Sequence, residues 1–165
     1  MQHLGDLDRP VLCLVVLGDR DDRPPDRDPG VVRWWQEPRD DFLAAETDVH
    51  KYAVLLDRDV IGFVQWHEET DPMYRHANMD IYVDPAVHGR GVGTDAVRTL
   101  TRHLVRDRGH HRLVIDPAAD NVAAIRCYAK VGFRPVGVLR QYEQGPDGTW
   151  HDGLLMDLVA DDLII

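Results

Sequence analysis

Apolar residues recur along the chain with the two-residue period of strands or in short unbroken runs. Residues 10–17, 50–56, 60–66, 77–83 and 112–115 are rich in Val, Ile, Leu and aromatic side chains, and we expect each of them to form a strand. Asp57-Arg58-Asp59 separates the second of these runs from the third, which predicts a hairpin. Residues 67–75 have the composition of a polar loop.

The period lengthens to that of a helix in two segments. Residues 91–107 place six apolar side chains on one helical face, and Gly109 is a plausible C-cap. These side chains are Val92, Ala96, Val97, Leu100, Leu104 and Val105. Residues 121–131 predict a second helix, with Asp120 or Asn121 as its N-cap and Gly132 as its stop.

The two ends of the chain complete the predicted fold. Residues 133–144 and 149–159 flank a Gly-Pro-Asp-Gly turn and predict a closing hairpin. Prolines interrupt residues 18–30, which predicts a loop, and residues 31–35 and 41–46 predict short helical pieces. Antiparallel strands followed by strands that alternate with helices indicate a mixed α/β (α+β) fold. We expect one domain over residues 1–165, atypical in residues 1–30.

Composition narrows the class of protein. The chain has 165 residues, 44% of them hydrophobic and 29% charged, and no apolar run approaches the length that spans a membrane. The beginning of the sequence lacks the pattern of a signal peptide, so we expect a cytoplasmic protein, monomeric or homodimeric. Cys13 and Cys127 form no CxxC pair, and the nine histidines show no metal-ligand spacing, so we expect free thiols and no metal.

Charge is distributed unevenly along the chain. The net charge of −10 argues against nucleic-acid binding, which requires clustered Lys and Arg. Residues 1–83 carry a net −9, residues 84–134 a net +4 and residues 135–165 a net −5. A basic centre between acidic flanks suits a protein that holds a polyanion in one place and a polycation in another, although a random surface pattern is the simpler alternative.

A glycine-rich turn, residues 88–94, precedes the first predicted helix. Glycines allow backbone N–H groups to turn inward, and a helix N-terminus offers unpaired N–H groups and a partial positive charge to phosphate. The turn is not a Walker loop, since no Gly-Lys-Ser/Thr follows four free positions. It also departs from the dinucleotide fingerprint, since Thr94 stands where a third Gly or an Ala is required.

The second predicted helix carries another constellation. Asn121 and Tyr128 are seven residues apart and share a helical face, and Gly132-Phe133 follow. The Asn amide can contact a ligand, and the tyrosine can hold or protonate a leaving group. A capping Asn and a core Tyr are the structural alternatives.

Together these two motifs resemble the GNAT acyltransferase superfamily. Its acetyl-CoA loop, Gln/Arg-x-x-Gly-x-Gly/Ala, corresponds to His88, Gly91 and Gly93, with His in place of Gln or Arg. Its later helix motif is complete in Asn121, Ala124, Tyr128, Gly132 and Phe133. The resemblance covers residues 31–157.

The resemblance implies a centrally splayed β-sheet flanked by helices, with acetyl-CoA as cofactor. The strands of residues 77–83 and 112–115 would part, and the pantetheine arm would pair with the edge of the first while the pyrophosphate sits on the glycine turn. The cofactor-binding residues would be Ile81, Tyr82, Val83, His88, Gly89, Arg90, Gly91, Val92, Gly93, Thr94, Asn121, Ala124 and Tyr128. The acetyl carbonyl would receive a backbone N–H near Val83.

Within the superfamily the chain looks like the aminoglycoside 6'-N-acetyltransferases. The matching segments are residues 32–35, 61–65, 68–72 and 115–117, followed by Asn121 and residues 124–128. The family usually has a helix before the tryptophan pair, where this chain has its proline-broken loop. The resemblance implies a small polycationic substrate, and candidates to bind it are Trp34, Trp35, Gln65, Glu68, Glu69, Asp71, Asp80, Asp116 and Asp152.

Acetyl transfer requires a neutral amine and a stabilised leaving thiolate. Asp116 is the candidate general base, or else an anchor for the ammonium group, because free Asp has a pKa of about 3.9. Tyr128 is the candidate donor to the thiolate. Three functions stay open: acetylation of an aminoglycoside 6'-amine with antibiotic resistance, acylation of another amine (a protein N-terminus, a lysine, a siderophore precursor), and CoA or antibiotic binding without turnover.

Overall fold

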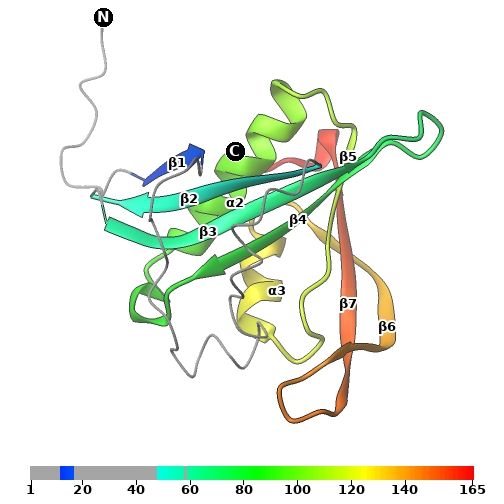
Figure 1. Cartoon of the computed structure of the whole chain (residues 1–165). Coiled ribbons are helices and arrows are strands. Elements are labelled where there is room, and N and C mark those ends of the chain that lie inside the picture. Colours follow the sequence, from blue (N-terminus) through cyan, green and yellow to red (C-terminus); the bar gives the residue numbers. More distant parts are fainter. Residues whose placement is uncertain (1–11, 17–47, 58) are drawn as a thin grey trace, which may run out of the picture.

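The fold is built around one mixed β-sheet, shown in a computed structural model of the chain (Figure 1). The structure describes residues 12–16, 48–57 and 59–165. In this part of the chain seven strands lie in the order β1-β2-β3-β4-β5-β7-β6. They are β1 (Leu12–Val16), β2 (Val49–Leu56), β3 (Asp59–Glu69), β4 (His76–Val83), β5 (Arg112–Ile115), β6 (Arg134–Gln144) and β7 (Trp150–Val159).

Helices connect the strands where the chain crosses the sheet. Neighbouring strands pair antiparallel, except that β4 and β5 pair parallel, as a crossover through helix α2 (Val92–Arg106) requires. Helix α3 (Val122–Ala129) follows β5, and two short 3₁₀ helices, η2 (Pro85–Val87) and η3 (Ala160–Asp162), complete the described elements. The mixed α/β prediction is confirmed.

The core lies between α2 and the sheet. The face of α2 that the apolar spacing predicts is buried, with Ala96, Val97 and Leu104 fully covered. From the sheet, alternate residues of β4 reach the same core, Ala77 and Met79 among them, while Asn78 and Asp80 between them point to the opposite face.

Several predicted boundaries need correction. The prediction of a loop from residue 67 is wrong, because β3 keeps pairing with β4 as far as Glu69 and His76. The residue that caps the end of α2 is Asp107, whose N–H bonds to the His103 carbonyl. Gly109 takes a left-handed φ of 71° in the turn beyond, and the His110 N–H bonds back to the Leu104 carbonyl at 3.0 Å, so Gly109 is the helix-terminating glycine that the sequence predicts. Helix α3 ends two residues earlier than predicted. The predicted helical pieces at 31–35 and 41–46 and the loop at 18–30 lie outside the described residues.

β4 and β5 part soon after they meet. Only Ala77↔Leu113 and Asn78↔Val114 are paired between them, whereas β4 stays paired with β3 to its last residue, Val83. Figure 1 shows β4 running to one side while β7 runs away from it, with α3 beside the opening. The predicted central splay is therefore confirmed.

An aromatic cluster on β2, β3 and the turn after α2 consists of the buried Trp66 and His110 and the exposed His50. Trp66 stacks on His50 with ring centroids 4.1 Å apart and meets the edge of His110 at 5.6 Å. His110 is 1% exposed, and neither of its ring nitrogens has a hydrogen-bond partner within the described part of the chain. Burial, reinforced by the charges of Arg75 and Arg108, lowers the pKa of His110, which Glu68 opposes.

This cluster predicts that stability falls in mild acid. The pKa of His110 is lower in the folded protein than in the unfolded chain, so the unfolded chain binds a proton at this residue more readily as the pH drops through about 6.5, and acid favours unfolding. His110→Leu should reduce the loss of unfolding free energy between pH 7.5 and pH 5, measured by urea denaturation. His67→Leu, at an exposed position of β3, is the control. An unchanged pH dependence in His110→Leu would contradict the prediction.

Candidate active site

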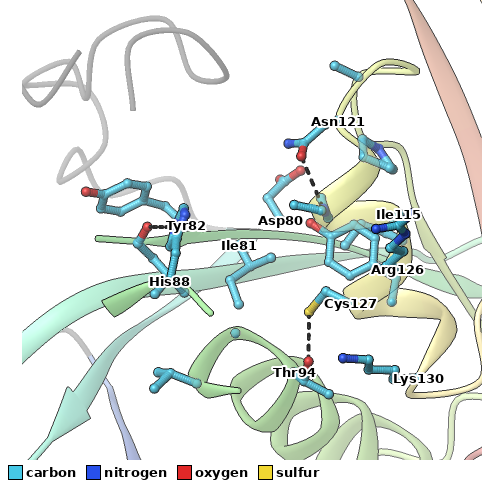
Figure 2. A pocket seen from close by; sticks show the side chains of 18 of the residues that line it. Asp80, Ile81, Tyr82, His88, Thr94, Ile115, Asn121, Arg126, Cys127 and Lys130 are labelled. Carbon is cyan, nitrogen blue, oxygen red and sulfur yellow. Dashed lines mark hydrogen bonds between the residues drawn. The ribbon is translucent and has the colours of Figure 1, made fainter. Parts of the chain in front are cut away.

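A cavity of about 850 Å³ opens where β4 and β5 part (Figure 2). Its walls come from the end of β4, the turn into α2, the residues after β5, helix α3 and the last residues of β6. Segments that are far apart in the sequence therefore meet around one space.

The turn into α2 forms one end of the cavity. Gly91 is the N-cap of α2 with a left-handed φ of 85°, and an added Cβ at Gly89 or Gly91 would meet no atom within 4 Å. The free N–H groups of the first helical turn adjoin this open cradle, an arrangement that binds phosphate. Among the predicted turn residues, those that line the cavity are His88, Gly89, Gly91, Val92, Gly93 and Thr94; Arg90 does not.

His88 has a local structural contact. Its Nε2 lies 2.8 Å from the carbonyl oxygen of Val83, the last residue of β4. The imidazole therefore ties the glycine turn to the strand, at the position where the family motif has Gln or Arg.

The edge of β4 forms the floor of the cavity. Ile81, Tyr82 and Val83 all line it, and pairing of β4 with β5 has already ended at Asn78. An extended ligand can lie along this edge as an added strand does.

Helix α3 contributes the third wall. The Oδ1 atom of Asn121 accepts a hydrogen bond from the Ala124 N–H at 3.1 Å, so the capping role is confirmed. Asn121, Ala124 and Tyr128 all line the cavity, as their shared helical face predicts. Burial, and then the neighbouring Cys127, Asp80 and Asp116, raises the pKa of Tyr128, so the phenol keeps its proton at neutral pH.

The end of the cavity away from the glycine turn is acidic. Asp80, Asp116 and Glu143 line it together with Tyr142. Burial raises the pKa of Asp80, and the charge of Asp116 adds to this, while a 2.9 Å hydrogen bond from Gln65 Nε2 opposes it. Gln65 and Asp80 are register partners on β3 and β4, which explains their contact.

Three of the predicted substrate residues lie elsewhere. Glu68 and Glu69 are the last residues of β3, and Asp71 follows in the turn to β4. All three lie at the end of the β3–β4 hairpin opposite the cavity, and none of them lines it. Glu68 pairs with Arg75, and the Glu69 carboxylate accepts the Asp71 N–H. The carboxylates of Glu68 and Glu69 therefore make contacts within the β3–β4 hairpin.

Two more of the predicted substrate residues, Gln65 and Asp152, do not line the cavity themselves. Gln65 reaches the cavity only through Asp80, and the carboxylate of Asp152 accepts the Gln141 N–H at 2.8 Å, outside the lining. Trp34 and Trp35 lie outside the described residues.

The sequence reasoning missed several residues that line the cavity. Arg126 and Lys130, four residues apart on α3, place positive charge beside Cys127, whose thiol accepts a hydrogen bond from Thr94. The sequence did carry a signal for Arg126 and Lys130, because both lie within the helix motif between Asn121 and Gly132. Tyr142 and Glu143 gave no such signal, because an irregularity in β6 brings them to the cavity.

Two further findings concern the described residues alone. None of their helices is long and apolar enough to cross a membrane. No group of three His, Cys, Asp or Glu side chains among them is arranged to hold a metal ion.

The sequence matches the acetyltransferase (GNAT) family over residues 18–133, and the chain belongs to this family. It is an acetyl-CoA-dependent acetyltransferase. The open glycine cradle and the β4 edge beyond its pairing with β5 fit this cofactor, which carries a pyrophosphate and an extended amide-containing arm.

Individual relatives differ in their substrates. The chain is 30% identical over 141 residues to aminoglycoside N(6')-acetyltransferase type 1 of Klebsiella pneumoniae, covering 72% of this chain and 68% of that protein. It is 37% identical over 71 residues to the N-alpha-acetyltransferase RimI of Mycobacterium tuberculosis, covering 43% and 42%. A crystal structure of the aminoglycoside acetyltransferase AAC(6')-Ib with coenzyme A has a TM-score of 0.71 at 24% identity, covering 92% of this chain and 96% of that one.

The glycine cradle makes a testable prediction about cofactor binding. Gly91→Ala should weaken CoA binding about tenfold or more, because the methyl group enters the open space and displaces charge-assisted hydrogen bonds worth about 1.5–3 kcal/mol each. Isothermal titration calorimetry with CoA measures the effect.

Gly109→Ala is a matched control at the other end of α2. Gly109 also has a positive φ, 71°, with open space at its Cβ, so both variants carry the same backbone strain. Equal CoA affinity in the two variants would show that the cradle does not bind the cofactor.

Proposed function

We propose that this acetyltransferase acts on a primary amine of an aminoglycoside, the 6'-amine, and thereby gives antibiotic resistance. The observation that carries the proposal is the division of one cavity into a glycine cradle and an acidic end. Asp80, Asp116 and Glu143 offer negative charge to a polycationic aminosugar, and the aminoglycoside-modifying relatives support the same substrate class.

The cofactor supplies an acetyl group activated as a thioester. In our proposal the N–H groups at the start of α2 hold its pyrophosphate, while Arg126 and Lys130 add positive charge beside them. The β4 edge at Ile81–Val83 orients the extended arm, and Asn121 and Ala124 confine it from α3.

The acidic end prepares the amine. An amine must lose a proton to become a nucleophile, and a carboxylate whose pKa is raised accepts that proton better than an ordinary one. Burial gives Asp80 this property, which makes it the preferred general base. Asp116, which accepts a hydrogen bond from the Tyr142 O–H, then acts as the ammonium anchor rather than as the base.

Tyr128 acts at the leaving group. Its phenol is buried and protonated, so in the proposal its O–H donates to the sulfur as negative charge develops there. Trp34 or Trp35 remains the proposed apolar platform for a sugar ring.

A second candidate function is acetylation of a protein N-terminus. The 37% identity to RimI over 71 residues favours it. A peptide with a free α-amine would present one positive charge to the cavity, whereas an aminoglycoside presents several.

The division of labour between the two aspartates is testable. Asp80→Asn should lower kcat on the order of 10²-fold, as expected for loss of a general base. Asp116→Asn should mainly raise KM for the amine. Steady-state kinetics measures both, with KM for acetyl-CoA as the internal control that neither change should move. Wild-type kcat in Asp80→Asn would assign proton removal to another group.

The substrate itself is tested by product analysis. Thiol release from acetyl-CoA should occur with kanamycin or tobramycin, and tandem mass spectrometry should locate the added acetyl group on the 6'-amine. Since salt screens charges separated by more than about 8–10 Å, kcat/KM should fall as NaCl is raised. Acetylation of an α-amine peptide without any acetylated aminoglycoside would favour the second function.

A further inference from the structure

Strand β6 contains a bulge beside the cavity. Its pairing with β7 steps from Leu139↔Gly153 to Glu143↔His151, so three residues of β6, 140–142, lie opposite one residue of β7, Asp152. Inside the bulge Gln141 has a φ of 51°, a left-handed conformation that is uncommon for a residue other than Gly. Such backbone persists only where surrounding contacts impose it, and it concentrates at functional sites.

Asp152 of β7 holds the bulge in place. Its side-chain Oδ1 accepts the Gln141 N–H, and its backbone carbonyl accepts the Ala119 N–H, both at 2.8 Å. Ala119 belongs to the segment that follows Asp116. A single residue of β7 therefore joins the bulge to the segment that carries the cavity aspartate.

The bulge directs Tyr142 onto Asp116. The tyrosine ring lies on the backbone of Gly153, where an added Cβ would be 2.9 Å from Tyr142 Cδ1. From this position the Tyr142 O–H donates to Asp116 Oδ2 at 2.6 Å. The same hydrogen bond is the largest reason why the pKa of Tyr142 rises to about 12, so the phenol remains a donor at neutral pH.

Glu143 follows directly and lines the same cavity. Its pKa is raised by burial and by the charges of Asp116 and Asp80, with His151 opposing them. Three carboxylates in one electrostatic neighbourhood repel one another, and a ligand with more than one positive charge relieves that repulsion.

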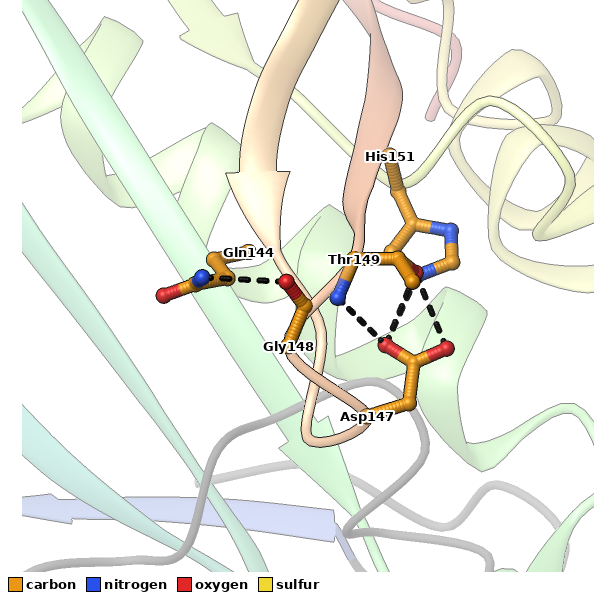
Figure 3. A network of polar contacts seen from close by, with 5 residues as sticks. All are labelled: Gln144, Asp147, Gly148, Thr149 and His151. Carbon is orange, nitrogen blue, oxygen red and sulfur yellow. Dashed lines mark hydrogen bonds and ion pairs between the residues drawn. The ribbon is translucent and has the colours of Figure 1, made fainter.

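The far end of the β6–β7 hairpin is fixed by polar contacts (Figure 3). Thr149 donates its N–H to Asp147 at 3.0 Å and its Oγ1 contacts both carboxylate oxygens, at 2.8 and 2.9 Å. His151 Nε2 lies 2.9 Å from the same hydroxyl oxygen. The hairpin is thus held on both sides of Tyr142 and Glu143.

We infer that the β6 bulge is a specificity element: Tyr142 is a positioning residue that orients Asp116 for one ammonium group, and Glu143 binds a second positive charge of the same substrate. The enzyme therefore prefers amines that carry several positive charges over amines that carry one. The inference rests on the proposed function only for the identity of the polycation.

The test compares substrates of different charge. Kanamycin and spermidine carry several amines, and 6-amino-6-deoxyglucose carries one on a similar sugar ring. Glu143→Gln should lower kcat/KM for the polycations about tenfold, the loss expected for one hydrogen bond to a charged group, and change it less than about twofold for the monoamine. Asp161→Asn, at an exposed position in η3, is the charge-matched control.

The positioning role of Tyr142 is tested separately, by the KM for amine substrates. Tyr142→Phe removes only the hydroxyl and should raise KM for every amine, with kcat, KM for acetyl-CoA and melting temperature retained. Asp152→Ala should reproduce the effects of Tyr142→Phe and Glu143→Gln together. Asp152→Asn keeps an oxygen that accepts the Gln141 N–H and should restore kinetics close to wild type.

The outcomes separate the two proposals. If kanamycin is acetylated but Glu143→Gln leaves the polycation-to-monoamine ratio unchanged, the specificity inference is overturned and the proposed function stands. If kanamycin is not acetylated but spermidine is, with a ratio that depends on Glu143, the inference holds and the aminoglycoside assignment fails.

Discussion

The parting of β4 from β5 is the constraint on which the rest of the structure depends. Two paired positions, at Ala77 and Asn78, hold the parallel strands together, and from there β4 follows β3 while β5 follows β7. Pairing of β4 with β5 ends at Asn78, so an extended amide-containing ligand can lie along the rest of this edge as an added strand does. The α2 N-terminus and α3 lie at the same opening, so the cofactor cradle, the strand edge and the acidic residues all converge on one cavity.

The two ends of that cavity face opposite electrostatic demands. At the α2 end, backbone N–H groups, Arg126 and Lys130 favour an anion, and at the β6 end the carboxylates favour a cation. Confining carboxylates costs free energy, which appears as the raised pKa values of Asp80 and Glu143. The Tyr142 hydroxyl offsets part of the cost at Asp116, and an ammonium substrate would offset the rest.

A feature of the site could be predicted from the sequence when it depends on residues that are close together in the chain. The glycine turn, the Asn121 cap and the Tyr128 face depend on spacing within about two helical turns, and the structure brings these residues to the cavity. Asp116 was singled out because it follows a short strand beside the splay, and Asp80 because it falls in or next to the acidic middle loop. The acidic run at Glu68–Asp71 lies outside the cavity, which the sequence could not show, because charge along a chain does not reveal toward which end of a hairpin it points. Tyr142 and Glu143 could not be predicted from the sequence, because a two-residue slip in the pairing register of β6 brings them to the cavity.

What the sequence by itself determined is the set of elements and their chemistry. Apolar periods of two and 3.6 residues specify the strands and α2, because these signals arise from short-range backbone geometry. The paired motifs indicate acetyl-CoA through their resemblance to the GNAT superfamily. Only the tertiary structure decided which acidic residues share the cavity, that burial raises the pKa of Asp80, and that Asp152 holds the β6 bulge while Tyr142 contacts Asp116. These properties depend on pairing register and on solvent exclusion between residues distant in sequence, and neither quantity is encoded in any local pattern.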